Sequence, residues 1–190
     1  MPSDDTSHFQ SIAWVSELLR DESFVTITTP SRVLKPTAED TFFATTINSP
    51  STIAACLTQY RRPSPSIKPL SPGTIPTDEI RIFCTLGTGL NGYPGVLHGG
   101  MVASLLDECM GLILSFNLGG GNPGHTGPVT AYLNTKFTRP VLTPGTFVVT
   151  GKVTESNDNR KWKIVGDIRD ADGNVCSQAE CLYVQPRSKI

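Results

Sequence analysis

The stretch Gly95-Val96-Leu97-His98-Gly99-Gly100-Met101-Val102-Ala103-Ser104-Leu105-Leu106-Asp107-Glu108 decides the fold of this chain. It opens an apolar segment from Gly99 to Leu118, which is long enough to form a buried helix. At about 100° per residue, one broad face of that helix is apolar. This face carries Met101, Val102, Leu105, Leu106, Cys109, Leu112 and Ile113. The sequence therefore predicts a helix that packs inside the core.

The other flank of this helix carries small residues and one acid. Gly100, Ser104, Asp107 and Gly111 fall within a narrow sector, where another backbone or a thin ligand can approach closely. One interpretation is that small residues only permit tight packing and that Asp107 is a solvated charge. The other is a functional acid, because an ionised carboxylate in an apolar segment is costly to bury unless it is paired or used.

The start of the helix provides a second chemical feature. At His98-Gly99-Gly100, free backbone N–H groups and the positive end of the helix dipole can stabilise negative charge on a carbonyl oxygen. A carboxylate near such an oxyanion site is the minimum set for activating water against a carbonyl. Glu108 is a rival carboxylate, but it lies about 100° further round the helix and faces a different environment.

The segments on either side of the helix predict strands. One strand is expected at 79–86, and four more follow a Gly-rich hinge or lid at 119–127, namely at 129–137, 146–154, 161–168 and 175–184. One strand, one helix and a meander of strands predict an α+β fold, with a curved antiparallel sheet wrapped around a central helix. Residues 76–190 form this domain. Residues 1–75 are expected to form an amphipathic helix at 8–21 and a Pro/Ser/Thr-rich arm with one short apolar element near 53–60.

The length and composition of the chain limit which classes of function are possible. At 190 residues one domain is the default. The 16 basic residues are matched by 17 acidic residues and do not cluster along one surface, so we expect no nucleic-acid partner. We also expect no membrane span. The five cysteines lack CxxC spacing, which indicates free thiols in a reducing compartment, no metal site and a cytoplasmic protein. The C-terminal Ser188-Lys189-Ile190 is similar to the peroxisomal S-K-L address, so a peroxisomal location is the alternative.

The stretch from Gly95 to Glu108 resembles the H-G-G-x6-D signature of hotdog-fold acyl-CoA thioesterases of the phenylacetate-pathway and 4-hydroxybenzoyl-CoA type. Residues 130–140 resemble the family's next strand, and the resemblance covers about residues 78–185. It implies a hotdog fold and hydrolysis of an acyl thioester carried by coenzyme A or a carrier protein. Coenzyme A would enter as part of the substrate, and no separate cofactor is implied.

The resemblance also implies roles for individual residues. Asp107 would be general base or nucleophile, Gly99 and Gly100 would form the oxyanion hole, His98 would shape it, and Thr130 would position water across a dimer interface. Candidate substrate-binding residues are Asn134, on the same strand face as Thr130, and Arg139, Arg160 and Lys161, for the phosphates of coenzyme A. Several family members have Asn or Gln six residues before the His. That position is Gly92 here, so Asn91, one step earlier, is the candidate.

We expect at least a homodimer, or a dimer of dimers, because a lone sheet of this kind leaves an edge strand that needs cover. Two alternatives to hydrolysis stay open. One is a lyase or isomerase on the same fold, in which Asp107 removes a proton beside the carbonyl. The other is a non-catalytic acyl-binding module. The acyl group and the choice between general base and nucleophile are not decided by the sequence.

Overall fold

The computed structural model describes residues 5–63, 76–118, 127–157 and 160–186. Most of the expected hinge or lid (residues 119–126) and the C-terminal tripeptide at 188–190 lie outside the described residues. In chain order the elements are α1 (Thr6–Gln10), α2 (Ala13–Leu19), β1 (Phe24–Thr28), η1 (Pro30–Arg32), η2 (Phe42–Thr46), β2 (Ile53–Arg61), β3 (Glu79–Leu86), η3 (Thr88–Leu90), β4 (Asn91–Tyr93), β5 (Val96–Leu97), α3 (Gly99–Leu118), β6 (Val129–Phe137), β7 (Gly145–Asn157), β8 (Lys161–Arg169) and β9 (Val175–Val184).

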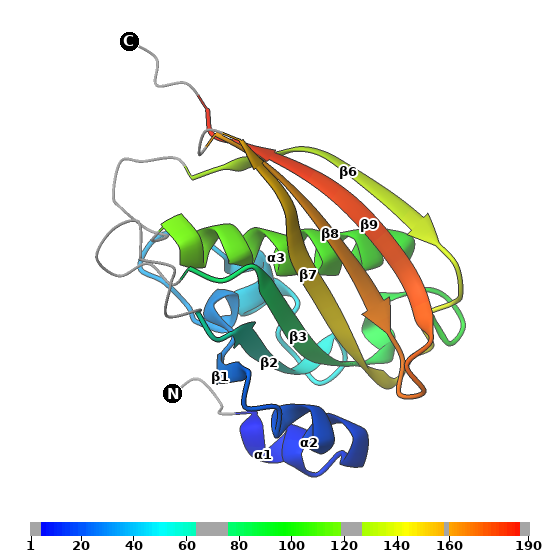
Figure 1. Ribbon diagram of the computed structural model, residues 1–190. Coiled ribbons are helices and arrows are strands. Elements are labelled where there is room, and N and C mark those ends of the chain that lie inside the picture. Colours follow the sequence, from blue (N-terminus) through cyan, green and yellow to red (C-terminus); the bar gives the residue numbers. More distant parts are fainter. Residues whose placement is uncertain (1–4, 64–75, 119–126, 158–159, 187–190) are drawn as a thin grey trace.

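A seven-stranded antiparallel sheet curves around α3 (Figure 1). Its strand order in the described residues is β1-β2-β3-β7-β8-β9-β6, so β1 and β6 are the edges. Alternate strand residues face the helix, for example Val149, Ile164 and Cys181, and they pack on the apolar face of α3. The predicted helix, the five predicted strands and the hotdog fold class are confirmed.

By length and composition alone α3 could also span a bilayer. In this fold it is the core helix, because its buried side chains, among them Leu106, Cys109, Met110 and Ile113, pack under the sheet.

The N-terminal region differs from its prediction in two respects. The expected single helix over 8–21 is two short helices, because the backbone at Ile12 is extended (φ −96°, ψ 111°). The apolar element near 53–60 is β2, which pairs with β3 along seven residue pairs from Ile53↔Leu86 to Tyr60↔Ile80. The sheet therefore continues across the boundary predicted between residues 75 and 76.

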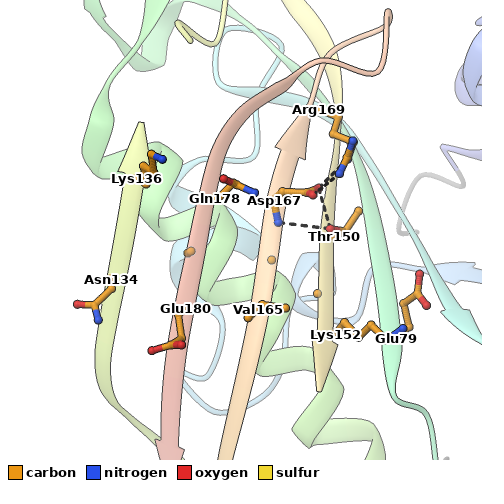
Figure 2. A pocket seen from close by; sticks show the side chains of 13 residues that line it. Glu79, Asn134, Lys136, Thr150, Lys152, Val165, Asp167, Arg169, Gln178 and Glu180 are labelled. Carbon is orange, nitrogen blue, oxygen red and sulfur yellow. Dashed lines mark hydrogen bonds and ion pairs between the residues drawn. The ribbon is translucent and has the colours of Figure 1, made fainter. Parts of the chain in front are cut away.

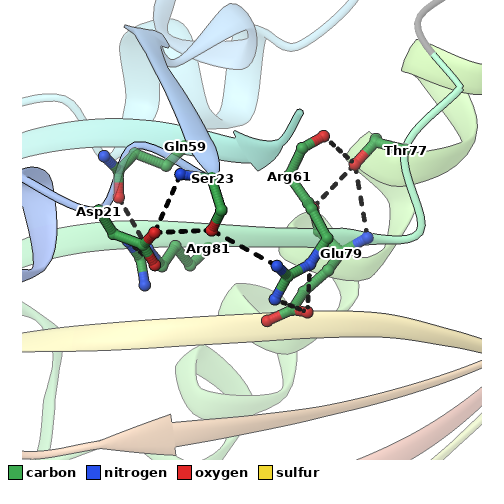
Figure 3. Close-up of polar contacts among 7 residues, drawn as sticks. All are labelled: Asp21, Ser23, Gln59, Arg61, Thr77, Glu79 and Arg81. Atoms are coloured by element: carbon green, nitrogen blue, oxygen red, sulfur yellow. Dashed lines mark hydrogen bonds and ion pairs between the residues drawn. The ribbon is translucent and has the colours of Figure 1, made fainter. Parts of the chain in front are cut away.

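The helices α1 and α2 cover the face of β2, β3 and β7 that points away from α3. Phe9 and Val15 are fully buried there against Leu57, Phe83 and Val148. A polar network at the edge of this contact joins the segment after α2 to the sheet (Figure 3). In it Arg81 donates to Gln59 Oε1 at 2.7 Å, and Arg61 donates to Glu79 Oε2 at 2.6 Å.

The rest of this outer face carries polar side chains over β6, β9, β8 and β7 (Figure 2). Asp167 accepts a hydrogen bond from Thr150 at 2.9 Å and pairs with Arg169 at 2.6 Å. Asn134, Gln178 and Glu180 lie beside this group, on the side of the sheet opposite α3.

Candidate active site

Asp107 projects from the middle of α3 into a cleft of about 440 Å³ between the helix, the arm and β9. The helix contributes the floor. Gly111 and Ser115 follow Asp107 at intervals of four residues, so they continue one stripe along α3 from the carboxylate. Phe116 and Tyr183 also line the cleft. The sector of small residues predicted from the sequence therefore opens onto a cavity.

Two hydroxyl groups hold the Asp107 carboxylate. Thr130 Oγ1 and Tyr183 Oη both donate to the same carboxylate oxygen, Oδ1, each at 2.9 Å. Thr130 and Tyr183 are directly opposite each other in the pairing of β6 with β9, which explains why their side chains converge. The Tyr183 hydroxyl also lies 2.8 Å from the backbone oxygen of Asp107. Asp107 is thus fixed by both strands that it faces.

The surroundings shift the pKa values of two neighbours. Burial, followed by the charge of Asp107, raises the pKa of Tyr183 well above its usual range, so its hydroxyl stays a donor at neutral pH. Burial also raises the pKa of Glu108 to about 7, with smaller contributions from Asp40 and Asp107. Glu108 lines the same cleft as Asp107 and is therefore a second acid of this site.

The arm supplies the opposite wall of the cleft. Pro30, Lys35, Glu39 and Asp40 line it, and Lys35 Nζ pairs with Glu39 at 3.0 Å and with Asp40 at 2.7 Å. Asp40 has a positive φ of 59°, a conformation that few residues other than Gly, Asn and Asp adopt. Three of the carboxylates around this cleft, those of Glu39, Asp40 and Glu108, were not expected there from the sequence.

The predicted oxyanion residues lie at a different cavity. His98, Gly99 and Arg139 line a space of about 560 Å³ at the start of α3, together with the exposed Tyr93 and Phe137. The Gly100 N–H donates to His98 Nδ1 at 3.0 Å, so this amide is already bound within the chain. No acceptor for the Gly99 N–H lies among the described residues. Gly99 is therefore the freer donor of the two.

The predicted oxyanion donors and the predicted catalytic carboxylate lie apart within a single chain. Gly100 and Asp107 are seven residues apart on one helix, which separates them by about 10 Å along its axis. An oxyanion donor has to lie roughly 3 Å from the reacting oxygen. The helix start and the carboxylate of the same chain therefore do not meet at one point, and a second copy of the chain could supply a nearer donor.

Among the predicted substrate-binding residues, two line neither the cleft at Asp107 nor the cavity at the start of α3. The Asn91 side chain accepts a hydrogen bond from the Thr143 hydroxyl, so it is directed to the loop before β7. Asn134 was expected on the strand face of Thr130, which is wrong. A register shift between Thr130 and Tyr132 inserts an extra residue, and after such a bulge the alternation reverses. Asn134 therefore points to the outer face (Figure 2).

Arg160 and Lys161 are exposed residues at the end of the sheet that holds Thr130. Lys161 pairs with Val184, which in turn pairs with Val129. Arg160 and Lys161 therefore lie near the end of β6 that carries Thr130, but they do not line the cleft at Asp107. In the part of the chain that the structure describes, no group of three or more His, Cys, Asp and Glu side chains is arranged to hold a metal ion.

Comparisons with known proteins agree with this fold. The family model of the thioesterase superfamily matches residues 94–177. Verlamelin biosynthesis protein B of Lecanicillium sp. is 25% identical over 174 residues, covering 78% of this chain and 75% of that protein. Acyl-coenzyme A thioesterase THEM4 of Bos taurus is 31% identical over 111 residues, covering 57% of this chain and 42% of its own length. This chain therefore spans less than half of the bovine relative.

A solved structure shows the same fold. Zebrafish thioesterase superfamily member 2 superposes with a TM-score of 0.51 at 17% identity, covering 62% of this chain and 79% of the zebrafish chain.

Proposed function

The chain carries a hotdog domain of the thioesterase superfamily, and on that basis we propose that it hydrolyses an acyl thioester with Asp107 as the catalytic carboxylate. The proposed substrate is an acyl-CoA or a carrier-bound acyl group. The relative named acyl-coenzyme A thioesterase supports the first of these. No cofactor beyond the coenzyme A of the substrate is needed for this chemistry.

The observation that carries the proposal is the state of the Asp107 carboxylate. Two hydroxyl donors bind its Oδ1, and the group lines an open cleft. These bonds hold the carboxylate in one place, and a carboxylate held at a cleft can accept a proton from water or attack a carbonyl carbon. A carboxylate that served only as a surface charge would need no such support.

Two routes fit this geometry. In the first, Asp107 takes a proton from water while the water oxygen bonds to the carbonyl carbon; the C–S bond then breaks, and the thiolate receives the proton from Asp107. In the second, Asp107 itself bonds to the carbonyl carbon and expels the thiolate, and water then hydrolyses the resulting anhydride. Both routes yield a carboxylic acid and a thiol. A single turnover in ¹⁸O-labelled water separates them, because only the anhydride route can leave label in Asp107.

Either route needs donors at the carbonyl oxygen, and in one chain the helix start lies about 10 Å from Asp107 along the helix axis. We therefore propose that a second copy supplies them. The edge strand β6 is suited to this contact, because Val129 and Phe137 at its two ends are 42% and 57% exposed. Antiparallel pairing of two β6 strands about Leu133 would bring Phe137 of one copy opposite Val129 of the other.

This pairing would also bring the two half-sites together. The Phe137 ring lies beside Gly99, since a Cβ atom on Gly99 would be 3.6 Å from it. Thr130, next to Val129, bonds Asp107. The helix start of one copy would thus approach the carboxylate of the other, and each dimer would hold two complete sites.

The test is thiol release from a panel of acetyl-, hexanoyl-, palmitoyl- and phenylacetyl-CoA and from N-acetylcysteamine thioesters. Asp107→Asn should abolish turnover and keep substrate binding, measured by calorimetry. Asp172→Asn is the matched control, because Asp172 is an exposed residue of the β8–β9 turn. Undiminished thiol release by Asp107→Asn would contradict the proposal.

The same panel of thioesters distinguishes hydrolysis from the two alternative functions. A lyase or isomerase would change the acyl chain without releasing a free thiol, which mass spectrometry of the acyl-CoA would detect. An acyl-binding module would bind members of the panel and convert none. The relative in verlamelin biosynthesis is named for a biosynthetic role, which makes the lyase or isomerase alternative worth testing.

A further inference from the structure

The Asp107 carboxylate is asymmetric. Its Oδ1 accepts hydrogen bonds from Thr130 and Tyr183, whereas no donor among the described residues reaches Oδ2. An oxygen that already accepts two hydrogen bonds is less basic than one that accepts none. Oδ2 is therefore the oxygen available for a proton or for a carbonyl carbon.

Tyr183 differs from Thr130 in how it makes this contact. It is 3% exposed and comes from β9, an interior strand of the sheet, whereas Thr130 is exposed on the edge strand β6. Its hydroxyl lies within hydrogen-bonding distance of two atoms of the same residue, Asp107 Oδ1 at 2.9 Å and Asp107 O at 2.8 Å. Tyr183 thus ties the side chain of Asp107 to the backbone of α3, which restricts rotation of the carboxylate.

The space for this contact comes from the helix. A Cβ atom on Gly111, one turn beyond Asp107, would lie 3.5 Å from the Tyr183 hydroxyl oxygen. The hydroxyl end of the Tyr183 side chain therefore lies directly over Gly111. An added Cβ would make an ordinary van der Waals contact here, whereas a larger, branched side chain would compete with Tyr183 for the space beside the carboxylate.

We propose that Tyr183 is a positioning residue of the thioesterase site, which directs Oδ2 of Asp107 toward the reacting carbonyl or water. The inference rests on the proposed function. The single hydroxyl hydrogen has two acceptors on Asp107, and it can shift toward the backbone oxygen when the carboxylate takes up a proton. Tyr183 itself transfers no proton in this scheme, because burial and the nearby charge keep its hydroxyl protonated.

The test is Tyr183→Phe in the full-length chain, with kcat and KM measured across pH on whichever thioester of the panel the wild type hydrolyses best. Loss of a hydrogen bond to a charged group should lower kcat roughly tenfold to a hundredfold. KM should change little. A fall in kcat at nearly constant KM is the signature of a carboxylate that is still present but wrongly oriented.

A matched control is Thr150→Val. Thr150 lies on β7 and donates to Asp167 Oδ1 at 2.9 Å on the outer face, so its loss should leave kcat and KM unchanged. Thermal melts of both variants check folding. If Tyr183→Phe does not fold, Gly111→Val provides a second variant that keeps the hydroxyl and displaces it, and the same fall in kcat with little change in KM is expected.

The two possible failures are distinguishable. An inactive Asp107→Asn together with a Tyr183→Phe variant that keeps the wild-type kcat would overturn the role of Tyr183 alone. A fully active Asp107→Asn would overturn the proposed function. A fall in kcat in Tyr183→Phe that comes with a comparable rise in KM and a lowered melting temperature would indicate a structural role and also overturn the inference.

Discussion

Thr130 lies directly opposite Tyr183 in the pairing of β6 with β9, and the hydroxyls of both residues donate to one oxygen of Asp107. The pair therefore links the edge strand, an interior strand and the core helix at a single atom. The register of β6 on β9 decides whether this arrangement exists, because a slip of one residue would turn Thr130 to the other face.

Removing the Thr130 hydroxyl tests this arrangement from the edge strand. Thr130→Val keeps the shape of the side chain and should lower kcat roughly tenfold, since Oδ1 keeps Tyr183 as its second donor. Thr154→Val is the control, because Thr154 is an exposed residue of β7 that donates to the Lys163 carbonyl at 3.1 Å. Equal kcat values for both variants on the thioester panel would argue against a role for Thr130.

The part of the site that could be predicted from sequence is the part carried by α3 and the start of β6. Helical spacing placed Asp107 on a flank of small residues, and the hydroxyl of Thr130 does reach it. Asn134 was misplaced, because a bulge reverses the alternation of a strand and leaves no strong sequence signal. Tyr183 was missed, because alternation marks it only as an inward residue of β9, and the sequence does not show which helix residue it meets.

The arm is the largest difference in the fold. Its prolines predicted an irregular segment with one short apolar element near 53–60, yet residues 53–61 form a strand of the main sheet. Long-range pairing with β3 decides this, and strand propensity depends on such context. For the same reason no local pattern could indicate that Lys35, Glu39 and Asp40 would face Asp107 across a cleft.

Glu108 should make stability depend on pH. Its pKa rises from 4.5 in the unfolded chain to about 7 in the folded protein, mainly through burial. The folded state therefore favours the protonated acid. This stabilisation is fully present below pH 4.5 and is lost as the pH rises through about 7.

Across this window the free energy of unfolding should fall by about 3 kcal/mol more in the wild type than in Glu108→Gln, which cannot ionise. Urea unfolding at a series of pH values measures the difference. Glu17→Gln, at a position on α2, provides the matched control and should keep the wild-type slope. A slope in Glu108→Gln equal to that of the wild type would show that Glu108 ionises freely in the folded protein.

Arg81 should be the most sensitive residue of the contact between the N-terminal helices and the sheet (Figure 3). Its side chain is 11% exposed, donates to the Leu18 carbonyl at 2.7 Å and lies 3.9 Å from the centre of the Phe24 ring. Arg81→Met leaves these partners without a cation and should lower the free energy of unfolding by about 2–4 kcal/mol. Arg62→Met, at an exposed neighbouring position, should change it by less than about 0.5 kcal/mol in the same urea experiment.

A mixture of two inactive variants tests whether the site is shared between copies. Asp107→Asn removes the carboxylate, and Gly99→Pro removes the amide donor at the first residue of α3, a position where proline is tolerated. In a heterodimer of the two variants, one site would carry both changes and the other site would carry neither. Refolding the variants together should therefore restore about a quarter of the wild-type thiol release, because half of the dimers are mixed and each holds one intact site. If carboxylate and donor came from the same chain, every site would carry one of the two changes, and the mixture would stay as inactive as each variant alone.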